Sequence, residues 1–163
     1  MADIVVLGLL FLLSFTLHNL EEALWMPKWK QDKIRFLKPA PKNEFYFALI
    51  VLTSLSYLAV CLLAFYPEQR FFTYIFAGFL GAMTFNAIFP HLAATIALRK
   101  YAPGVITAVL LMLPINGLIL FYMASNGVLS VYEIVLSTLG VGIPMAASLP
   151  LLFWIGRKLI RFD

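Results

Sequence analysis

Five apolar segments, each long enough to cross a lipid bilayer as a helix, follow one another along this chain of 163 residues. About twenty helical residues cross the roughly 30 Å hydrocarbon core of a bilayer. Backbone amides inside lipid must be satisfied within the segment itself, so segments of this kind form helices. We expect an all-α polytopic membrane protein, one transmembrane domain over residues 1–163, with spans at about 3–25, 45–65, 71–98, 104–125 and 133–156.

The composition favours the same class of protein. Charged residues make up 12% of the chain and hydrophobic residues 63%, whereas about a quarter of the residues in a soluble domain are charged. No Lys or Arg precedes the first segment, so we expect a retained span and not a cleaved signal peptide. The expected location is a bacterial inner membrane.

Basic residues are distributed very unequally between the two sides of the predicted bundle. One side has only Arg70, and the positive-inside rule therefore predicts an outside N-terminus and a cytoplasmic C-terminus. Topology thus explains the net charge of +4, and we expect anionic lipid headgroups as partners and no nucleic acid. The basic residues of the cytoplasmic side are Lys28, Lys30, Lys33, Arg35, Lys38, Lys42, Arg99, Lys100, Arg157, Lys158 and Arg161.

The first span carries an unusual polar motif, His18-Asn19-Leu20-Glu21-Glu22. An ionisable side chain inside a bilayer costs several kcal/mol and is functional by default. Glu21 and Glu22 follow His18 by three and four residues, so both return to its side of the helix. They also differ from each other by about 100° around the axis, which predicts different roles for the two carboxylates.

The other histidine of the chain, His91, lies in the third span. Counting from the nearest cytoplasmic charges, Lys28 and Arg99, both histidines are about 12–15 Å inside the membrane. Both spans run from outside to inside. We therefore expect His18 and His91 at one depth, in the inner half of the membrane.

Pro90 predicts an irregular turn in the third span. It cannot donate to the carbonyl of Asn86 and clashes with it, which predicts a kink or a widened, π-type turn. Such a turn would bring Asn86 and His91, five residues apart, to one side of the helix. Asn116 follows Pro114 in the fourth span and is expected at about the depth of Asn86.

Three interpretations of these residues remain open. One is a hydrogen-bonded network that only holds helices together. Another is a metal site made of His18, His91 and either Glu21 or Glu22, because two His and one Glu with an open position form a catalytic zinc set and would also suit iron. The last is metal-free acid–base chemistry of the kind that a lipid isomerase needs, with Glu and His moving a proton.

The motifs resemble the HXXEE family of integral membrane proteins. The resemblance covers the first, third and fourth spans, and it supports the choice of site residues without implying a reaction. The chain is also similar to intramembrane CAAX-type proteases in its Glu-Glu pair, although the Arg of their motif is replaced by Met26. The family resemblance rests on His18-x-x-Glu21-Glu22, Asn86, Pro90-His91 and Arg99-Lys100-Tyr101-x-Pro103-Gly104-x-x-Thr107-Ala108.

The expected function is metal-assisted hydrolysis of a lipid-like or prenyl-like substrate that reaches a cytoplasmic-leaflet cavity from the side. We expect one divalent metal, zinc ahead of iron, with His18, Glu21 and His91 as ligands. A transporter of a metal ion or proton is the main alternative; the short chain and the odd number of spans speak against it, and a homodimer would offset the short chain.

Further roles in the expected site follow from the same assignment. Glu22 is the expected general base on a metal-bound water, although the roles of Glu21 and Glu22 could be exchanged. Asn86 is expected to orient the substrate or a ligand. Arg99 at the cavity mouth, through its charge, and Asn116 are expected to bind the substrate.

Overall fold

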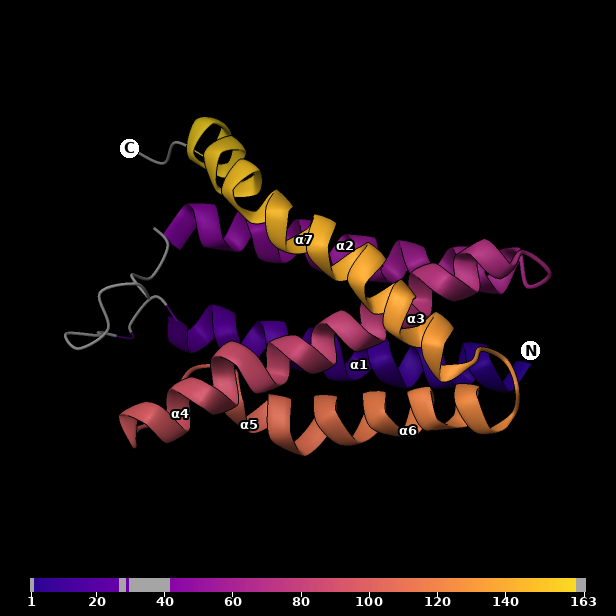
Figure 1. The fold of residues 1–163 in the computed structure, drawn as a ribbon. Coiled ribbons are helices and arrows are strands. Elements are labelled where there is room, and N and C mark those ends of the chain that lie inside the picture. Colours follow the sequence, from indigo (N-terminus) through magenta and orange to yellow (C-terminus); the bar gives the residue numbers. More distant parts are fainter. Residues whose placement is uncertain (1, 27–28, 30–41, 161–163) are drawn as a thin grey trace.

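The structure, a computed structural model, describes residues 2–26, 29 and 42–160, which form five long helices lying side by side (Figure 1). Each is long and apolar enough to cross a membrane, and no strand occurs in the described part, which confirms the predicted all-α architecture with five spans. The basic loop after the first span lies almost wholly outside the described residues. The elements are α1 (Ala2–Trp25), α2 (Lys42–Phe65), α3 (Arg70–Asn86), η2 (Ala87–Leu92), α4 (Ala93–Leu98), α5 (Val105–Thr107), η3 (Ala108–Met112), α6 (Leu113–Ser125) and α7 (Val131–Leu159).

The third span, built from α3, η2 and α4, bends at Pro90 as the sequence predicts. The η2 segment is π-helical, and Phe89 leaves the helical region with φ −130° and ψ 115°. The cause is Pro90, which lacks the N–H that would bond the carbonyl of Asn86. As a result Asn86 and His91 lie on one side of the span, with Asn86 Nδ2 3.3 Å from His91 Nε2.

The fourth span contains a second π-helical segment, η3, which the sequence did not reveal. Pro114 lies just beyond it and cannot donate to the carbonyl of Leu110, which favours a wider turn at this point. The η3 segment packs against both η2 and α1. The two irregular segments therefore meet beside the helix that carries the first polar motif.

The last helix, α7, begins at Val131, slightly earlier than predicted, because a capping box fixes its start. Ser130 N donates to Glu133 Oε2 at 2.8 Å, and Glu133 N donates back to Ser130 Oγ at 3.3 Å. The helix then runs without interruption through Pro144 and Pro150 to Leu159, beyond the predicted end.

α7 crosses the bundle obliquely, from α3 near its start to α2 near its end (Figure 1). Its first half lies close to α3 at two glycines: a Cβ on Gly81 would contact the side chain of Thr138, and one on Gly78 would contact Val141. At its other end Arg157 Nε donates to Glu44 Oε1 of α2 at 2.6 Å. The middle of α7 therefore diverges from the third span.

We predict that Gly81→Ala destabilises the bundle although alanine favours helices. The added methyl group has no space beside Thr138, and overpacking of this kind costs about 1–3 kcal/mol. Gly140→Ala on α7 is the matched control, because its Cβ would meet no atom within 4 Å. Thermal unfolding in detergent should show a lower midpoint for Gly81→Ala and an unchanged or higher one for Gly140→Ala. Equal midpoints would contradict the packing argument.

Candidate metal centre and the adjoining cavity

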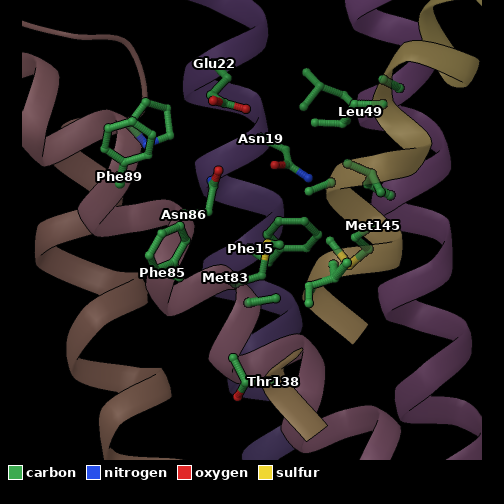
Figure 2. A pocket seen from close by; sticks show the side chains of 18 of the residues that line it. Phe15, Asn19, Glu22, Leu49, Met83, Phe85, Asn86, Phe89, Thr138 and Met145 are labelled. Carbon is green, nitrogen blue, oxygen red and sulfur yellow. The ribbon is translucent and has the colours of Figure 1, made fainter. Parts of the chain in front are cut away.

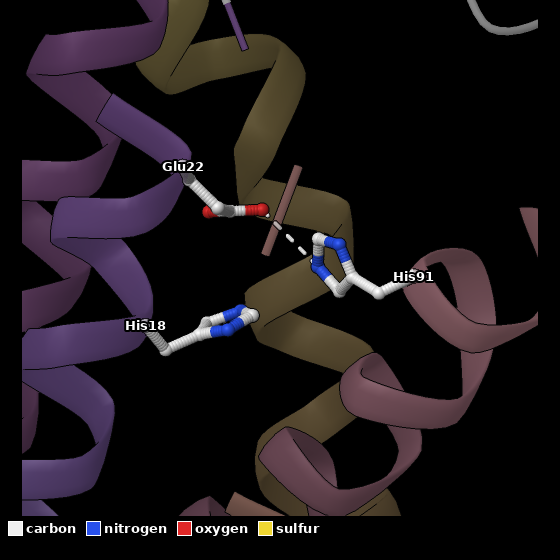
Figure 3. Close-up of side chains that lie close together, drawn as sticks. All are labelled: His18, Glu22 and His91. Carbon is white, nitrogen blue, oxygen red and sulfur yellow. Dashed lines mark ion pairs between the residues drawn. The ribbon is translucent and has the colours of Figure 1, made fainter. Parts of the chain in front are cut away.

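Three buried side chains, His18 and Glu22 from α1 and His91 from η2, point toward one another (Figure 3). Their potential ligand atoms all lie within 4.8 Å of one another. The two imidazole rings meet edge to face, with their centroids 4.8 Å apart. Counting residues from the charged ends therefore placed the two histidines correctly at one depth.

The loop between α4 and α5 holds both histidine rings through the same ring nitrogen. His18 Nδ1 lies 3.1 Å from the carbonyl oxygen of Gly104, and His91 Nδ1 lies 2.7 Å from that of Pro103. A carbonyl accepts only, so each Nδ1 carries the proton and donates it. Backbone carbonyls commonly orient metal-bound histidines in this way. Each Nε2 is then left with its lone pair directed into the cluster.

The two Nε2 atoms have very different surroundings. His18 Nε2 is buried and has no hydrogen-bond partner. His91 Nε2 lies 3.1 Å from Glu22 Oε1, a pair drawn as a dashed line in Figure 3. A lone pair facing a carboxylate oxygen is repulsive unless a proton or a metal ion lies between them. The contact between His91 and Glu22 is therefore compatible with either a shared proton or a bound metal ion.

Glu21 has a different task from Glu22, as the 100° offset predicted. Its oxygens accept hydrogen bonds from the Tyr101 hydroxyl at 2.5 Å, Ile106 N at 3.3 Å, Thr107 N at 2.8 Å and the Thr107 hydroxyl at 2.5 Å. The two backbone donors belong to the first turn of the fourth span, where N–H groups have no partner within the helix. Glu21 thus anchors the histidine-holding loop to α1.

Tyr101 and Thr107 have further roles in this anchor, and Thr107 connects it to the cluster. Burial, together with the hydrogen bond to Glu21, raises the pKa of the Tyr101 phenol well above its usual value, so that the hydroxyl keeps its proton and donates. The Thr107 hydroxyl donates to Glu21 and also lies 3.1 Å from His18 Nδ1. Glu21 consequently acts on His18 through Thr107, as a positioning residue.

Gly104 lies between the two histidines and is required there for two reasons. Its φ of +88° is in the left-handed region, which residues with a Cβ rarely adopt. A Cβ at this position would also lie 2.9 Å from Cε1 of both His18 and His91. The loop can therefore approach both rings only because residue 104 has no side chain.

A cavity of about 690 Å³ adjoins the cluster, within the size range of small-molecule sites. It lies among α1, α2, the third span and α7. Glu22, Asn19 and Asn86 gather toward one end of it, while Phe15, Met83 and Met145 line the remainder (Figure 2). Glu22 and Asn86 both contact His91, so they form the wall between the cavity and the histidines.

The structure does not place the expected residues all together. Glu22 takes the position beside the histidines that was expected for Glu21. Arg99 is exposed at the end of α4 and does not line the cavity. Asn116 is fully buried, and its Nδ2 donates to the carbonyl of Leu80 on α3, away from the cavity. The depth of a residue along a helix does not determine the direction in which its side chain points around the helix axis. This is why neither Arg99 nor Asn116 lines the cavity.

Residues of the loop before the fourth span escaped the reasoning from sequence, although they hold the cluster. Only the family resemblance pointed to this region, since the matching motif includes Tyr101, Pro103 and Gly104 of the loop and Thr107 of α5. A backbone carbonyl can accept a hydrogen bond from a histidine whatever side chain its own residue carries, so the amino-acid sequence does not reveal such contacts. Only Gly104, a glycine before a helix, could have indicated a close approach.

Together these features define an all-helical protein of the membrane-spanning type, with a buried His–His–Glu cluster beside an apolar cavity. The chain belongs to the HXXEE family: it matches the family described as "Protein of unknown function with HXXEE motif" over residues 9–119. It is 47% identical over 148 residues to the "Uncharacterized protein YrkK" of Bacillus subtilis (strain 168), which covers 91% of this chain and 94% of that relative. No solved structure matches the chain.

Proposed function

We propose that this protein is an integral membrane metalloenzyme that hydrolyses a lipid-like substrate, with one divalent metal, zinc ahead of iron. The ligands in this proposal are His18, His91 and Glu22, so that Glu22 replaces Glu21 of the sequence-based expectation. Two histidines and one glutamate leave a zinc ion one open position for water or substrate. The ligand atoms lie within 4.8 Å of one another and would have to move closer to reach the zinc bond length of about 2 Å.

One observation carries the metal assignment: the buried Nε2 of His18 has no partner. An unsatisfied polar atom in an apolar interior costs about 1–3 kcal/mol. Its lone pair faces a second histidine and a carboxylate, and the Nδ1 atoms of both rings are fixed by backbone carbonyls. A divalent metal would satisfy both lone pairs and remove the repulsion between His91 and Glu22.

The proposed reaction is hydrolysis of a carboxylic ester. Water adds to the carbonyl carbon, the bond to the alkoxy oxygen breaks, and the products are a carboxylic acid and an alcohol. The metal would lower the pKa of its water to about 7 and polarise the carbonyl. Glu22, on the cavity wall, would hold the metal through one carboxylate oxygen, and its other oxygen would take the proton of the water and return it to the leaving alkoxide. Asn86, 3.3 Å from His91, is placed to orient the substrate carbonyl.

The orientation in the membrane belongs to the same proposal. Arg99, Lys100, Arg157 and Lys158 lie at the end of the bundle nearer the cluster, and Arg70 lies at the other end. The positive-inside rule then puts the N-terminus outside and the cluster in the cytoplasmic half. The membrane would be the inner (plasma) membrane of a bacterium, and the relative YrkK is bacterial.

Metal-free acid–base chemistry, such as double-bond isomerisation of a lipid, is the second candidate. It is favoured by the contact of 3.1 Å between His91 Nε2 and Glu22 Oε1, because a proton held between the two would equally remove their repulsion. Such a pair on a cavity wall is placed to give and take a proton. The two candidates differ in whether activity needs a metal.

Hydrolysis of a long-chain nitrophenyl ester in detergent micelles tests the proposed function. We expect turnover by the zinc-loaded protein, loss after chelation, recovery on adding zinc, and no turnover by His91→Ala. Arg99→Asn should keep the activity, because Arg99 does not line the cavity and Asn tolerates its left-handed φ of 52°. Turnover that chelation leaves unchanged, or no turnover at all, would contradict the metallohydrolase.

A further inference from the structure

We infer that the cavity binds a single-chain lipid with an uncharged polar head, taken directly from the bilayer through an opening between η2 and α7. The inference rests on the proposed function only for the statement that this lipid is a substrate. It narrows the substrate class and names the path of access. Its basis is the charge of the cavity wall and the course of α7.

In the part of the chain that the structure describes, the polar end of the cavity without a bound metal offers an anionic head no basic side chain. Among the described residues that line the cavity, Glu22 is the single charged side chain, and the other polar groups near it are the amides of Asn19 and Asn86. A phosphate or carboxylate there would be buried against Glu22 without a basic partner, which is strongly unfavourable. An ester, amide or alcohol can instead hydrogen-bond to the two amides.

The remainder of the cavity fits an apolar chain. Away from Glu22 it is lined almost entirely by aliphatic and aromatic side chains of four helices, including Phe15, Leu52, Met83 and Met145. Its far end is closed near Thr138, where α7 packs tightly on α3 at Gly81. One tail extending from the polar end toward Thr138 would bury its surface there.

The course of α7 creates the opening. Near its start the helix is packed on α3, and near its end Arg157 ties it to Glu44 of α2, so between these points it leaves the third span (Figure 1). Phe85, Phe89 and Ile143 line the cavity and are also 65%, 59% and 62% exposed. The cavity thus reaches the outer surface of two apolar spans, where lipid tails lie.

Binding by chelator-treated protein tests the inference without any turnover. Native mass spectrometry from detergent micelles would compare monopalmitoylglycerol with its phosphate monoester, which share a tail and differ in head charge. We expect about one monopalmitoylglycerol per chain, with an affinity at least about tenfold higher than that of the phosphate ester. Equal or tighter binding of the phosphate ester would overturn the uncharged-head assignment.

Two adjacent alanines of α7 provide a matched pair for locating the bound lipid. Both are exposed, but only Ala146 lines the cavity, whereas Ala147 does not. Ala146→Trp should lower the affinity for monopalmitoylglycerol at least about tenfold by filling the opening, and Ala147→Trp should leave it unchanged. Equal effects would overturn the location. Binding without hydrolysis in the zinc-loaded protein would reject the proposed function and leave this inference standing.

Discussion

Glu22→Gln is expected to abolish tight metal binding, whereas Glu21→Gln, one residue away, is expected to retain the metal. A glutamine amide at position 22 offers zinc a neutral and weak oxygen ligand in place of a carboxylate. Glu21 faces the loop before the fourth span and acts on His18 only through Thr107. Removing contacts of that indirect kind costs about 10–100-fold in metal affinity, and removing a ligand costs more.

The effects of these two variants on stability should be in the reverse order, with Glu21→Gln the more destabilising. Glu21→Gln places an amide against the donors of Tyr101 and Thr107, which should lower the free energy of unfolding by about 1.5–3 kcal/mol. Glu22 has, among the described residues, only the contact with His91 to lose, so Glu22→Gln should lower the unfolding temperature of the metal-free protein less than Glu21→Gln does. Calorimetric zinc titration and thermal unfolding of both variants measure the two effects. If Glu21→Gln lost the metal and Glu22→Gln retained it, Glu21 would be the ligand and the assignment of Glu22 would be wrong.

Gly104→Ala is expected to damage both the fold and the cluster. A left-handed φ costs an alanine about 1–3 kcal/mol, and the added methyl group would lie 2.9 Å from both histidine rings, adding a similar overpacking cost. Thermal unfolding should therefore show a loss of about 2–6 kcal/mol. Zinc affinity should fall as well, because the rings must move.

Gly127→Ala separates these two contributions. Gly127 also has a left-handed φ, of +66°, but a Cβ there would meet no atom within 4 Å. This variant should therefore show only the backbone cost and should bind zinc like the unaltered protein. If Gly104→Ala were no more destabilising than Gly127→Ala, the claim that Gly104 separates the histidines would be incorrect.

Much of the fold could be predicted because single residues or short runs determine it locally. The apolar runs determine the five helices, and Pro90 causes the bend that brings Asn86 beside His91. Depth could be counted from the charged ends, so His18 and His91 were correctly expected together. Each of these features depends on one span and its distance from the membrane surface.

The remaining features depend on how the spans pack, which the sequence pattern does not contain. The choice between Glu21 and Glu22 is made by Tyr101 of the loop and by the first turn of the fourth span. Together they supply four donors to Glu21 and leave Glu22 beside His91. Asn116 lies in the fourth span, as read from the sequence, but its side chain is directed toward α3. The cavity itself exists because α7 crosses from α3 to α2.

The metal content of the purified protein tests the central claim most directly. The unaltered chain, purified in detergent without chelators and analysed by plasma mass spectrometry, should hold about one divalent transition metal, and His18→Ala should hold none. The buried and partnerless Nε2 of His18 is the reason for this expectation. An unaltered, folded chain that holds no metal, even after incubation with zinc, would contradict the metal centre and favour the proton-transfer pair of His91 and Glu22.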